Sequence, residues 1–288
     1  MSLYSKEISR ANKGCFVFLL DQSYSMEEPL GNSAQRKCDE LCTAINAWLR
    51  NMTIRASGDT GIKDWLDVAV IGYRTDDQAN AVIESALQGP LAGKTLLSIK
   101  EIGENPASID SVTQTFSDEE TGENVEMPMQ VPVWVTPRAE GGTPMCHVFD
   151  FTFGVLEEWI NNHPHSFPPI VINITDGESQ DGDPVPYADA LKQLATSDGS
   201  VLLFNCHLSM TAADSFMFPA SCEVLPDALA RSLFDMSSPL PEPILTRANG
   251  EGFELLANAR GMAFNADMVS LIKFLDLGTR PAQPTGLR

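Results

Sequence analysis

A short apolar run that ends abruptly in polar residues is the feature that most constrains the fold of this chain. The stretch from Cys15 to Met26 reads Cys-Phe-Val-Phe-Leu-Leu-Asp-Gln-Ser-Tyr-Ser-Met. Lys-Gly precedes it and Glu-Glu-Pro follows it, so the run cannot extend into a long helix. A run bounded in this way predicts a buried strand. It carries three oxygen-bearing side chains on a tight loop at its carboxyl end: Asp21, Ser23 and Ser25.

The apolar residues of the remaining chain recur alternately at helical and strand spacing. Helices are predicted at 31–52 with Ser33 as N-cap, and at 141–159, 187–196, 226–234, 252–259 and 268–277. Further strands are predicted at 65–73, 81–87, 170–175, 201–206 and 261–265, the last as a short edge strand.

This alternation predicts a doubly wound, Rossmann-like α/β fold, in which helices cover both faces of a mostly parallel central sheet. The connection at 76–80 is short and polar, so strand 81–87 is expected to pair with 65–73 as an antiparallel hairpin. The sheet is therefore expected to have one antiparallel edge strand.

A single domain is predicted over residues 15–277, after an N-terminal extension at 1–14 and before a flexible tail at 278–288. Two insertions interrupt it, at about 91–137 and 207–249. The first contains extended segments at 112–116 and 125–135 around an acidic turn, which predicts a β-hairpin. Its prolines, Pro128 and Pro132, favour edge strands.

The composition excludes several classes of protein. A net charge of −20 disfavours binding to nucleic acid or to an anionic membrane, because phosphates are bound by clustered Lys and Arg. No apolar segment is long enough to cross a bilayer, and residues 1–13 lack the apolar core of a signal segment, so a cytoplasmic protein is expected. The six cysteines form no Cys-x-x-Cys pair and are expected to be buried thiols.

Oxygen ligands occur on three loops of the predicted fold. Asp21, Ser23 and Ser25 follow the first strand, Thr143 follows a Gly-Gly turn at a helix start, and Asp176 follows strand 170–175. Each alone could be a cap, a helix entrance or a turn. Loops at the carboxyl ends of parallel strands share one crevice, so these groups can meet. Hydroxyls and carboxylates suit a hard cation such as Mg²⁺, with Mn²⁺ or Ca²⁺ as substitutes.

The Asp-x-Ser-x-Ser sequence, the threonine after Gly-Gly and the Thr-Asp-Gly at 175–177 together resemble the metal-ion-dependent adhesion site of von Willebrand factor type A (vWA) domains. The resemblance implies that Ser23 and Ser25 bind the metal directly. It implies that Thr143, Asp21 and Asp176 bind directly or through water. It further implies that a carboxylate from a partner protein completes the coordination.

The amino-acid sequences of these motifs are most similar to those of the stand-alone bacterial vWA proteins associated with tellurite resistance. That resemblance implies a non-enzymatic adaptor in a signalling or stress-response complex. The partner would be a kinase or phosphatase, or else a MoxR-type AAA ATPase. The two insertions are candidates for partner selectivity.

The alternative is a phosphatase-like hydrolase that uses the same cation. The sequence contains no nucleophile elbow, phosphate-binding loop or dinucleotide fingerprint. His147 falls inside a predicted helix, and His163 and His165 lie in a proline-rich loop without further ligands.

Overall fold

The computed structural model describes residues 3–30, 34–117, 124–208, 215–265, 270 and 273–275. Its centre is a sheet in the order β13-β14-β12-β9-β1-β4-β5, in which β6 also pairs with β4. The parallel strands are β1 (Gly14–Asp21), β4 (Leu66–Thr75), β9 (Ile170–Thr175), β12 (Leu202–His207) and β14 (Met262–Phe264). The antiparallel strands are β5 (Ala81–Ser85), β6 (Leu97–Ser98) and β13 (Phe216–Met217).

The strand β1 lies in the middle of the sheet, between β4 and β9, and all eight of its residues are buried. The chain runs from β1 to β4 in one direction along the sheet, and from β9 to β12 in the other. The strands β1 and β9 are neighbours, and the chain leaves them toward opposite edges of the sheet. Such a switch point is where open α/β sheets form a crevice.

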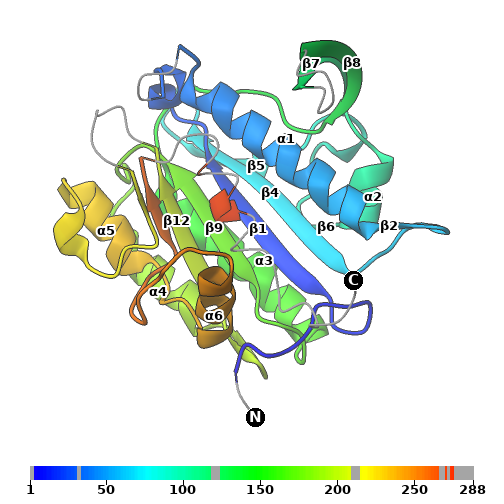
Figure 1. Cartoon of the computed structure of the whole chain (residues 1–288). Coiled ribbons are helices and arrows are strands. Elements are labelled where there is room, and N and C mark those ends of the chain that lie inside the picture. The colour runs from blue at the N-terminus through cyan, green and yellow to red at the C-terminus, as the bar shows by residue number, and fades with distance from the viewer. Residues whose placement is uncertain are drawn as a thin grey trace.

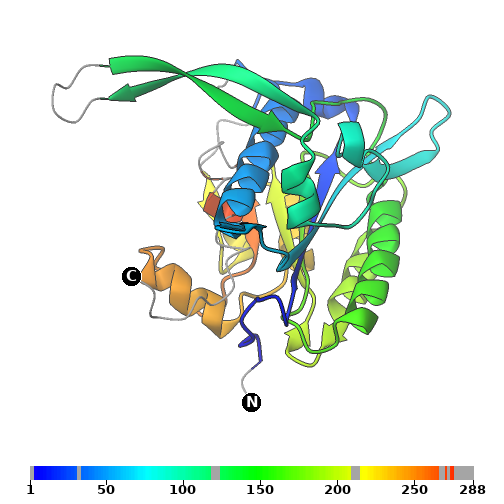
Figure 2. The same cartoon turned by 90° about the vertical axis from the view of Figure 1, so that its right-hand side faces the viewer.

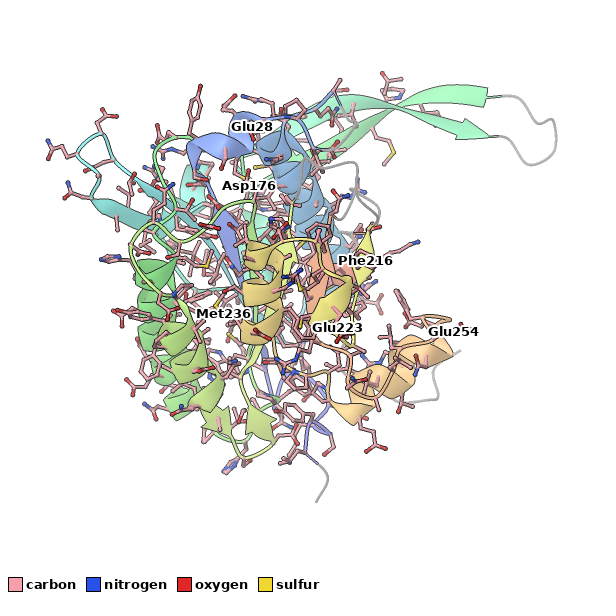
Figure 3. The ribbon with its side chains drawn as sticks, turned by 90° about the vertical axis from the view of Figure 1, so that its left-hand side faces the viewer. Glu28, Asp176, Phe216, Glu223, Met236 and Glu254 are labelled. Carbon is pink, nitrogen blue, oxygen red and sulfur yellow. The ribbon has the colours of Figure 1, made fainter. Side chains whose placement is uncertain are left out.

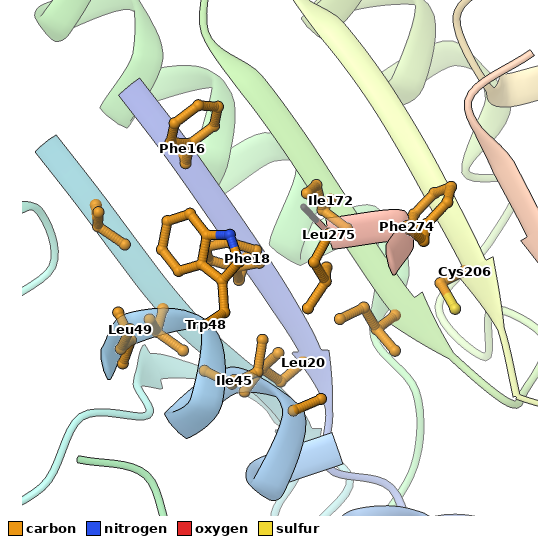
Figure 4. Packing of buried hydrophobic residues seen from close by; sticks show 14 of the residues in the cluster. Phe16, Phe18, Leu20, Ile45, Trp48, Leu49, Ile172, Cys206, Phe274 and Leu275 are labelled. Carbon is orange, nitrogen blue, oxygen red and sulfur yellow. The ribbon is translucent and has the colours of Figure 1, made fainter. Parts of the chain in front are cut away.

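Alternate residues of β1 pack on opposite faces of the sheet. Phe16, Phe18 and Leu20 belong to the core beneath α1 (Lys37–Ala56), where the Trp48 ring lies 4.6 Å from that of Phe18 (Figure 4). The other face carries α3 (Met145–Asn162), α4 (Val185–Gln193) and α5 (Ala228–Met236). Figure 1 shows helices on both sides of the strands, as a doubly wound fold requires. The predicted fold class is confirmed.

The predicted β-hairpin insertion is present as β7 (Ser108–Ser117) and β8 (Asn124–Val133), which form a two-stranded sheet of their own. It projects away from the body of the molecule (Figure 2). The remaining elements are α2 (Ile99–Glu104), α6 (Glu242–Gly250), the 3₁₀ turns η1 (Tyr24–Glu27), η2 (Gly89–Leu91) and η3 (Cys222–Val224), and the short pairs β2 (Ser57–Gly58) with β3 (Gly61–Ile62) and β10 (Ala195–Thr196) with β11 (Gly199–Ser200).

Two predictions near the C-terminus are wrong. The helix expected at 252–259 is a series of turns, because Gly252 and Glu254 have positive φ values of 92° and 51°. The helix of this region is α6, in which a proline occupies the first turn, a position that helices tolerate. In addition, β14 is not an edge strand, since β13 pairs outside it in antiparallel orientation. The sheet thus has antiparallel strands at both edges.

Several predicted boundaries fall partly on residues that the structure does not describe. Ser33 lies outside the described residues, and α1 begins later, at Lys37. Of the predicted closing helix, residues 273–275 are helical, and Phe274 and Leu275 pack into the core. The rest of it lies largely outside the described residues, and the predicted tail lies wholly outside them. Among the residues that are described, no helix is both long enough and apolar enough to cross a bilayer.

Candidate metal and partner site

Asp21 stands at the carboxyl end of β1 and fixes the loop that follows. Its side chain is buried, and Oδ1 accepts a hydrogen bond from the backbone N–H of Ser23 at 2.8 Å. The other oxygen, Oδ2, accepts a hydrogen bond from the Thr175 hydroxyl at 2.5 Å. Because Thr175 is the last residue of β9, this carboxylate joins the ends of two neighbouring strands.

The two serines extend this connection toward Asp176. Ser23 Oγ and Ser25 Oγ lie 3.1 Å apart, and the Ser25 hydroxyl donates to Asp176 Oδ1 at 2.7 Å. The side chain of Asp176 is completely buried. Hydroxyl and carboxylate oxygens from the loops after β1 and β9 therefore form one continuous cluster. Tyr24, between the two serines, is 71% exposed.

The Thr143 loop is the third component of the site. Gly141 has a φ of 69°, and a Cβ there would lie 2.0 Å from the carbonyl oxygen of Thr75, so only glycine lets the loop approach the end of β4. The Gly141 carbonyl accepts a hydrogen bond from Tyr24 N at 2.9 Å. Thr143 is buried, and its Oγ1 lies 3.3 Å from the point where a Cβ on Gly177 would stand.

Ser25 Oγ lies 3.9 Å from that same point next to Gly177. The three loops therefore meet around a glycine of the Thr-Asp-Gly sequence, which leaves room for them. All five residues predicted from the sequence are brought together at the switch point: Asp21, Ser23, Ser25, Thr143 and Asp176.

Two buried carboxylates, Asp21 and Asp176, lie in this cluster and influence each other. Burial raises the pKa of Asp21 to about 6, and the negative charge of Asp176 adds to the rise, while hydrogen bonds from Ser23 and Thr175 oppose it. Within the described ranges, no three His, Cys, Asp or Glu side chains are grouped to hold a metal. A cation here would depend on hydroxyl donors, and neutral hydroxyls with carboxylates are a donor set that fits Mg²⁺.

Lys37 is a component that the sequence analysis missed. It is the first residue of α1, it is 3% exposed, and its Nζ donates to Asp176 Oδ2 at 2.6 Å. The same ammonium reaches Glu28 Oε2 at 3.2 Å and the Ser25 carbonyl at 3.4 Å. The available signal was a lysine in the first turn of a helix, where the dipole disfavours a positive charge unless an anion lies nearby.

A cavity of about 550 Å³ opens beside this cluster. Ser25, Glu28, Lys37 and Asp176 line one side of it, and the start of α5 lines another. Figure 3 looks onto the side of the molecule where Glu28 and Asp176 are labelled. His207, at the end of β12, also lines the cavity, and burial lowers its pKa. Ser25 and Asp176 therefore border a hollow that several acidic side chains line.

The other residues considered from the sequence lie outside this arrangement. His163 stacks on Trp159, with ring centroids 4.5 Å apart, and His165 Nδ1 lies 3.2 Å from the hydroxyl of Ser197. His147 Nδ1 lies 2.6 Å from Asp181. All six cysteines are free thiols, as predicted; five of them are buried, whereas Cys222 is partly exposed.

The sequence matches no protein-family profile and no curated protein. The solved structures similar to it include the following two. The PilB minor pilin from Streptococcus sanguinis has a TM-score of 0.47 and 10% identity, covering 94% of this chain and 62% of that one. The ArnB paralog VWA2 from Sulfolobus acidocaldarius has a TM-score of 0.32 and 15% identity, covering 68% of this chain and 35% of that one. This chain thus spans less than two thirds of either protein.

Both TM-scores are below 0.5, so nothing is carried over from these proteins to this chain. The fold class follows from the strand order and from the helices on both faces of the sheet, which describe a doubly wound α/β architecture.

Proposed function

We propose that this protein is a metal-dependent interaction module that binds an acidic residue of a partner protein through Mg²⁺. The observation that carries the proposal is the convergence of three loops on one buried cluster of hydroxyls and carboxylates. Each loop is separately anchored to the end of a central strand. This construction positions oxygen donors before any ligand arrives.

The five site residues would have two different roles, according to whether the side chain is a hydroxyl or a carboxylate. Ser23, Ser25 and Thr143 would offer neutral hydroxyls, while Asp21 and Asp176 would bind directly or through water. When bound, Mg²⁺ would supply a positive charge with an open coordination position. Thr175 holds Asp21 in place through its hydroxyl, and the backbone N–H of Ser23 holds the other oxygen. Neutral donors leave the charge of the cation incompletely balanced, which favours an added carboxylate.

The proposed biological setting is a cytoplasmic bacterial signalling or stress-response complex, of the kind formed by tellurite-resistance-associated vWA proteins with kinases or phosphatases. The alternative setting is an adaptor role beside a MoxR-type AAA ATPase. The projecting β7–β8 hairpin supports an adaptor, because it offers Ile109, Val112 and Met127 as exposed apolar contacts at 61%, 43% and 52% exposure. Single exposed apolar residues are ordinary, but a two-stranded hairpin with several is a candidate for partner selectivity.

The rival function is a metal-dependent hydrolase at the same site. One observation favours it: His207 lines the cavity that Asp176 also lines, and its Nδ1 has no hydrogen-bond partner among the described residues. Turnover of a phosphate ester with Mg²⁺, abolished by Ser23→Ala, would establish the hydrolase and overturn the non-enzymatic adaptor. Absence of turnover with intact metal binding is the expected result.

The adaptor proposal is tested by affinity capture from the native cell, with and without a chelator. Asp21→Ala and Thr143→Ala are the site variants, and Thr43→Ala on the exposed side of α1 is the matched control. We expect the wild type and Thr43→Ala to retain a partner that chelator, Asp21→Ala and Thr143→Ala each release. Identical partners in all samples would remove the metal site from the mechanism.

A further inference from the structure

Lys37 has a charge and a position that an ordinary surface lysine does not have. Its side chain is 3% exposed and its partner Asp176 has no exposed side chain. Burial of an ammonium is costly unless an anion compensates for it. The start of a helix adds to the cost, because the partial charge there is also positive. Its placement therefore depends on the pair with Asp176.

The pair uses an atom that the proposed metal site also needs. Asp176 has two carboxylate oxygens: Oδ1 accepts from the Ser25 hydroxyl, and Oδ2 accepts from Lys37 at 2.6 Å. A divalent cation bound among Ser23, Ser25 and Asp176 would share this carboxylate with a resident ammonium. Two cations that share one buried carboxylate repel each other and divide its negative charge.

The charges of the cluster can be followed through binding. With the buried Asp21 and Asp176 ionised and the buried Lys37 protonated, these three side chains carry one net negative charge, while Glu28, whose side chain is 47% exposed, is screened by solvent. A divalent cation would change this to one net positive charge. One carboxylate from a partner would then bring the cluster to neutrality. Without the lysine, the divalent cation alone would already achieve neutrality.

We infer that Lys37 acts as a tethered cation, which weakens the binding of a bare divalent ion and couples metal binding to the arrival of an acidic ligand. This inference rests on the proposed metal site and adds a residue that tunes it. The carboxylate Glu28, which contacts the same ammonium at 3.2 Å, offers Lys37 a second anion within the cavity. The Lys37 ammonium can therefore shift toward the Glu28 carboxylate when Asp176 also contacts a bound metal ion.

The test is a titration with Mn²⁺ followed by electron paramagnetic resonance, which counts free ions. Lys37→Met removes the charge and keeps much of the length of the side chain, whereas Lys37→Arg keeps the charge. Lys100→Met, on the exposed surface of α2, is the matched control. We expect Lys37→Met to bind Mn²⁺ about tenfold more tightly or better, and the other two to stay close to the wild type.

Excess acetate serves as the probe for the acidic ligand in the same titrations. We expect acetate to tighten Mn²⁺ binding in the wild type more than in Lys37→Met. If the wild type and Lys37→Met bind Mn²⁺ with equal affinity, or if Lys37→Met binds it more weakly, the proposed role of Lys37 is overturned. The proposed metal site would still stand in either case. If none of these proteins binds Mn²⁺, the metal site fails and the inference fails with it.

A second readout covers the case in which Lys37→Met folds poorly without metal. The midpoint of thermal unfolding is measured with and without Mn²⁺. We expect the metal to raise it by more in Lys37→Met than in the wild type, since linkage converts tighter binding into added stability. An equal or smaller rise in the variant would contradict the inference.

Discussion

The loops after β1 and β9 both carry a buried carboxylate, but they are held by different forces. Asp21, after β1, accepts from neutral donors, the Ser23 N–H and the Thr175 hydroxyl. Asp176, after β9, is paired with the ammonium of Lys37. The β1 loop is thus ordered by hydrogen bonds from neutral donors. The β9 loop is ordered by an ion pair, and its ammonium would repel any cation bound to Asp176.

The β9 loop is anchored by a second carboxylate a few residues later. Asp181 accepts from the backbone N–H groups of Cys146 and His147 at 3.0 Å each, and it lies 2.6 Å from His147 Nδ1. These contacts tie the loop to the first turn of α3, next to Thr143. The two loops thus differ in what holds the carboxylate next to the strand end: neutral donors hold Asp21 after β1, and an ion pair holds Asp176 after β9.

The largest expected effect comes from Lys37→Met in metal-free protein. The change leaves Asp176 buried without its counter-charge, and breaking one side of a buried ion pair typically costs about 3–5 kcal/mol. The free energy of unfolding, from denaturant titration in chelator, should fall by that amount. Lys100→Met should remain within about 0.5 kcal/mol of the wild type. Equal stability of both variants would show that the Lys37–Asp176 pair does not order the β9 loop.

A smaller effect is expected from Thr175→Val, which removes the hydroxyl that donates to Asp21 and keeps the shape of the side chain. The change removes the hydrogen bond to the buried Asp21 carboxylate and the one that the hydroxyl accepts from Gly177 N–H at 3.2 Å, which together cost about 2–3 kcal/mol because the buried carboxylate is left partly unsatisfied. The same denaturant titration measures it. A loss of unfolding free energy greater than that of Lys37→Met would contradict the comparison. The hydrogen bonds that hold Asp21 would then stabilise the fold more than the Lys37–Asp176 ion pair does.

The smallest effect is expected from Asp181→Asn, and it depends on pH. Partial burial acts to raise the pKa of Asp181. The hydrogen bonds from the His147 side chain and from the backbone of His147 and Cys146 outweigh it and lower the pKa to about 2. A lowered pKa in the folded state means that the ionised form stabilises the fold above pH 4, and that this stabilisation is lost as pH falls toward 2.

After allowance for solvent screening, Asp181→Asn should cost about 1 kcal/mol at pH 7 and close to nothing at pH 2. The difference in free energy of unfolding between the two proteins, followed across this range, is the measurement. A difference that grows as the pH falls would contradict the assigned role of this carboxylate.

The parts of the fold that could be predicted from sequence were those written in local patterns. The strand Ile170–Thr175 was predicted with its observed bounds, because an apolar run stands between prolines and an aspartate. The five site residues could be predicted to meet because each lies at or just after a strand end or just before a helix start. Sequence periodicity and one topological rule were sufficient for that step.

The parts that could not be predicted depend on distant contacts or on very short elements. Lys37 pairs with a residue 139 positions away, and no local pattern reports such a contact. The strand β13 has two residues, too few for alternation to be recognised. The helix α6 contains a proline in its first turn, so its sequence resembles a loop, while the helical pattern at 252–259 is broken by positive φ values.

The central claim is that the oxygen cluster binds a divalent cation. Its most direct test is anomalous diffraction from a crystal of the full chain soaked in Mn²⁺. We predict one strong anomalous peak among the side chains of Ser23, Ser25 and Thr143. A crystal in which this cluster is well ordered and shows no peak, while Mn²⁺ is bound elsewhere or not at all, would contradict the claim.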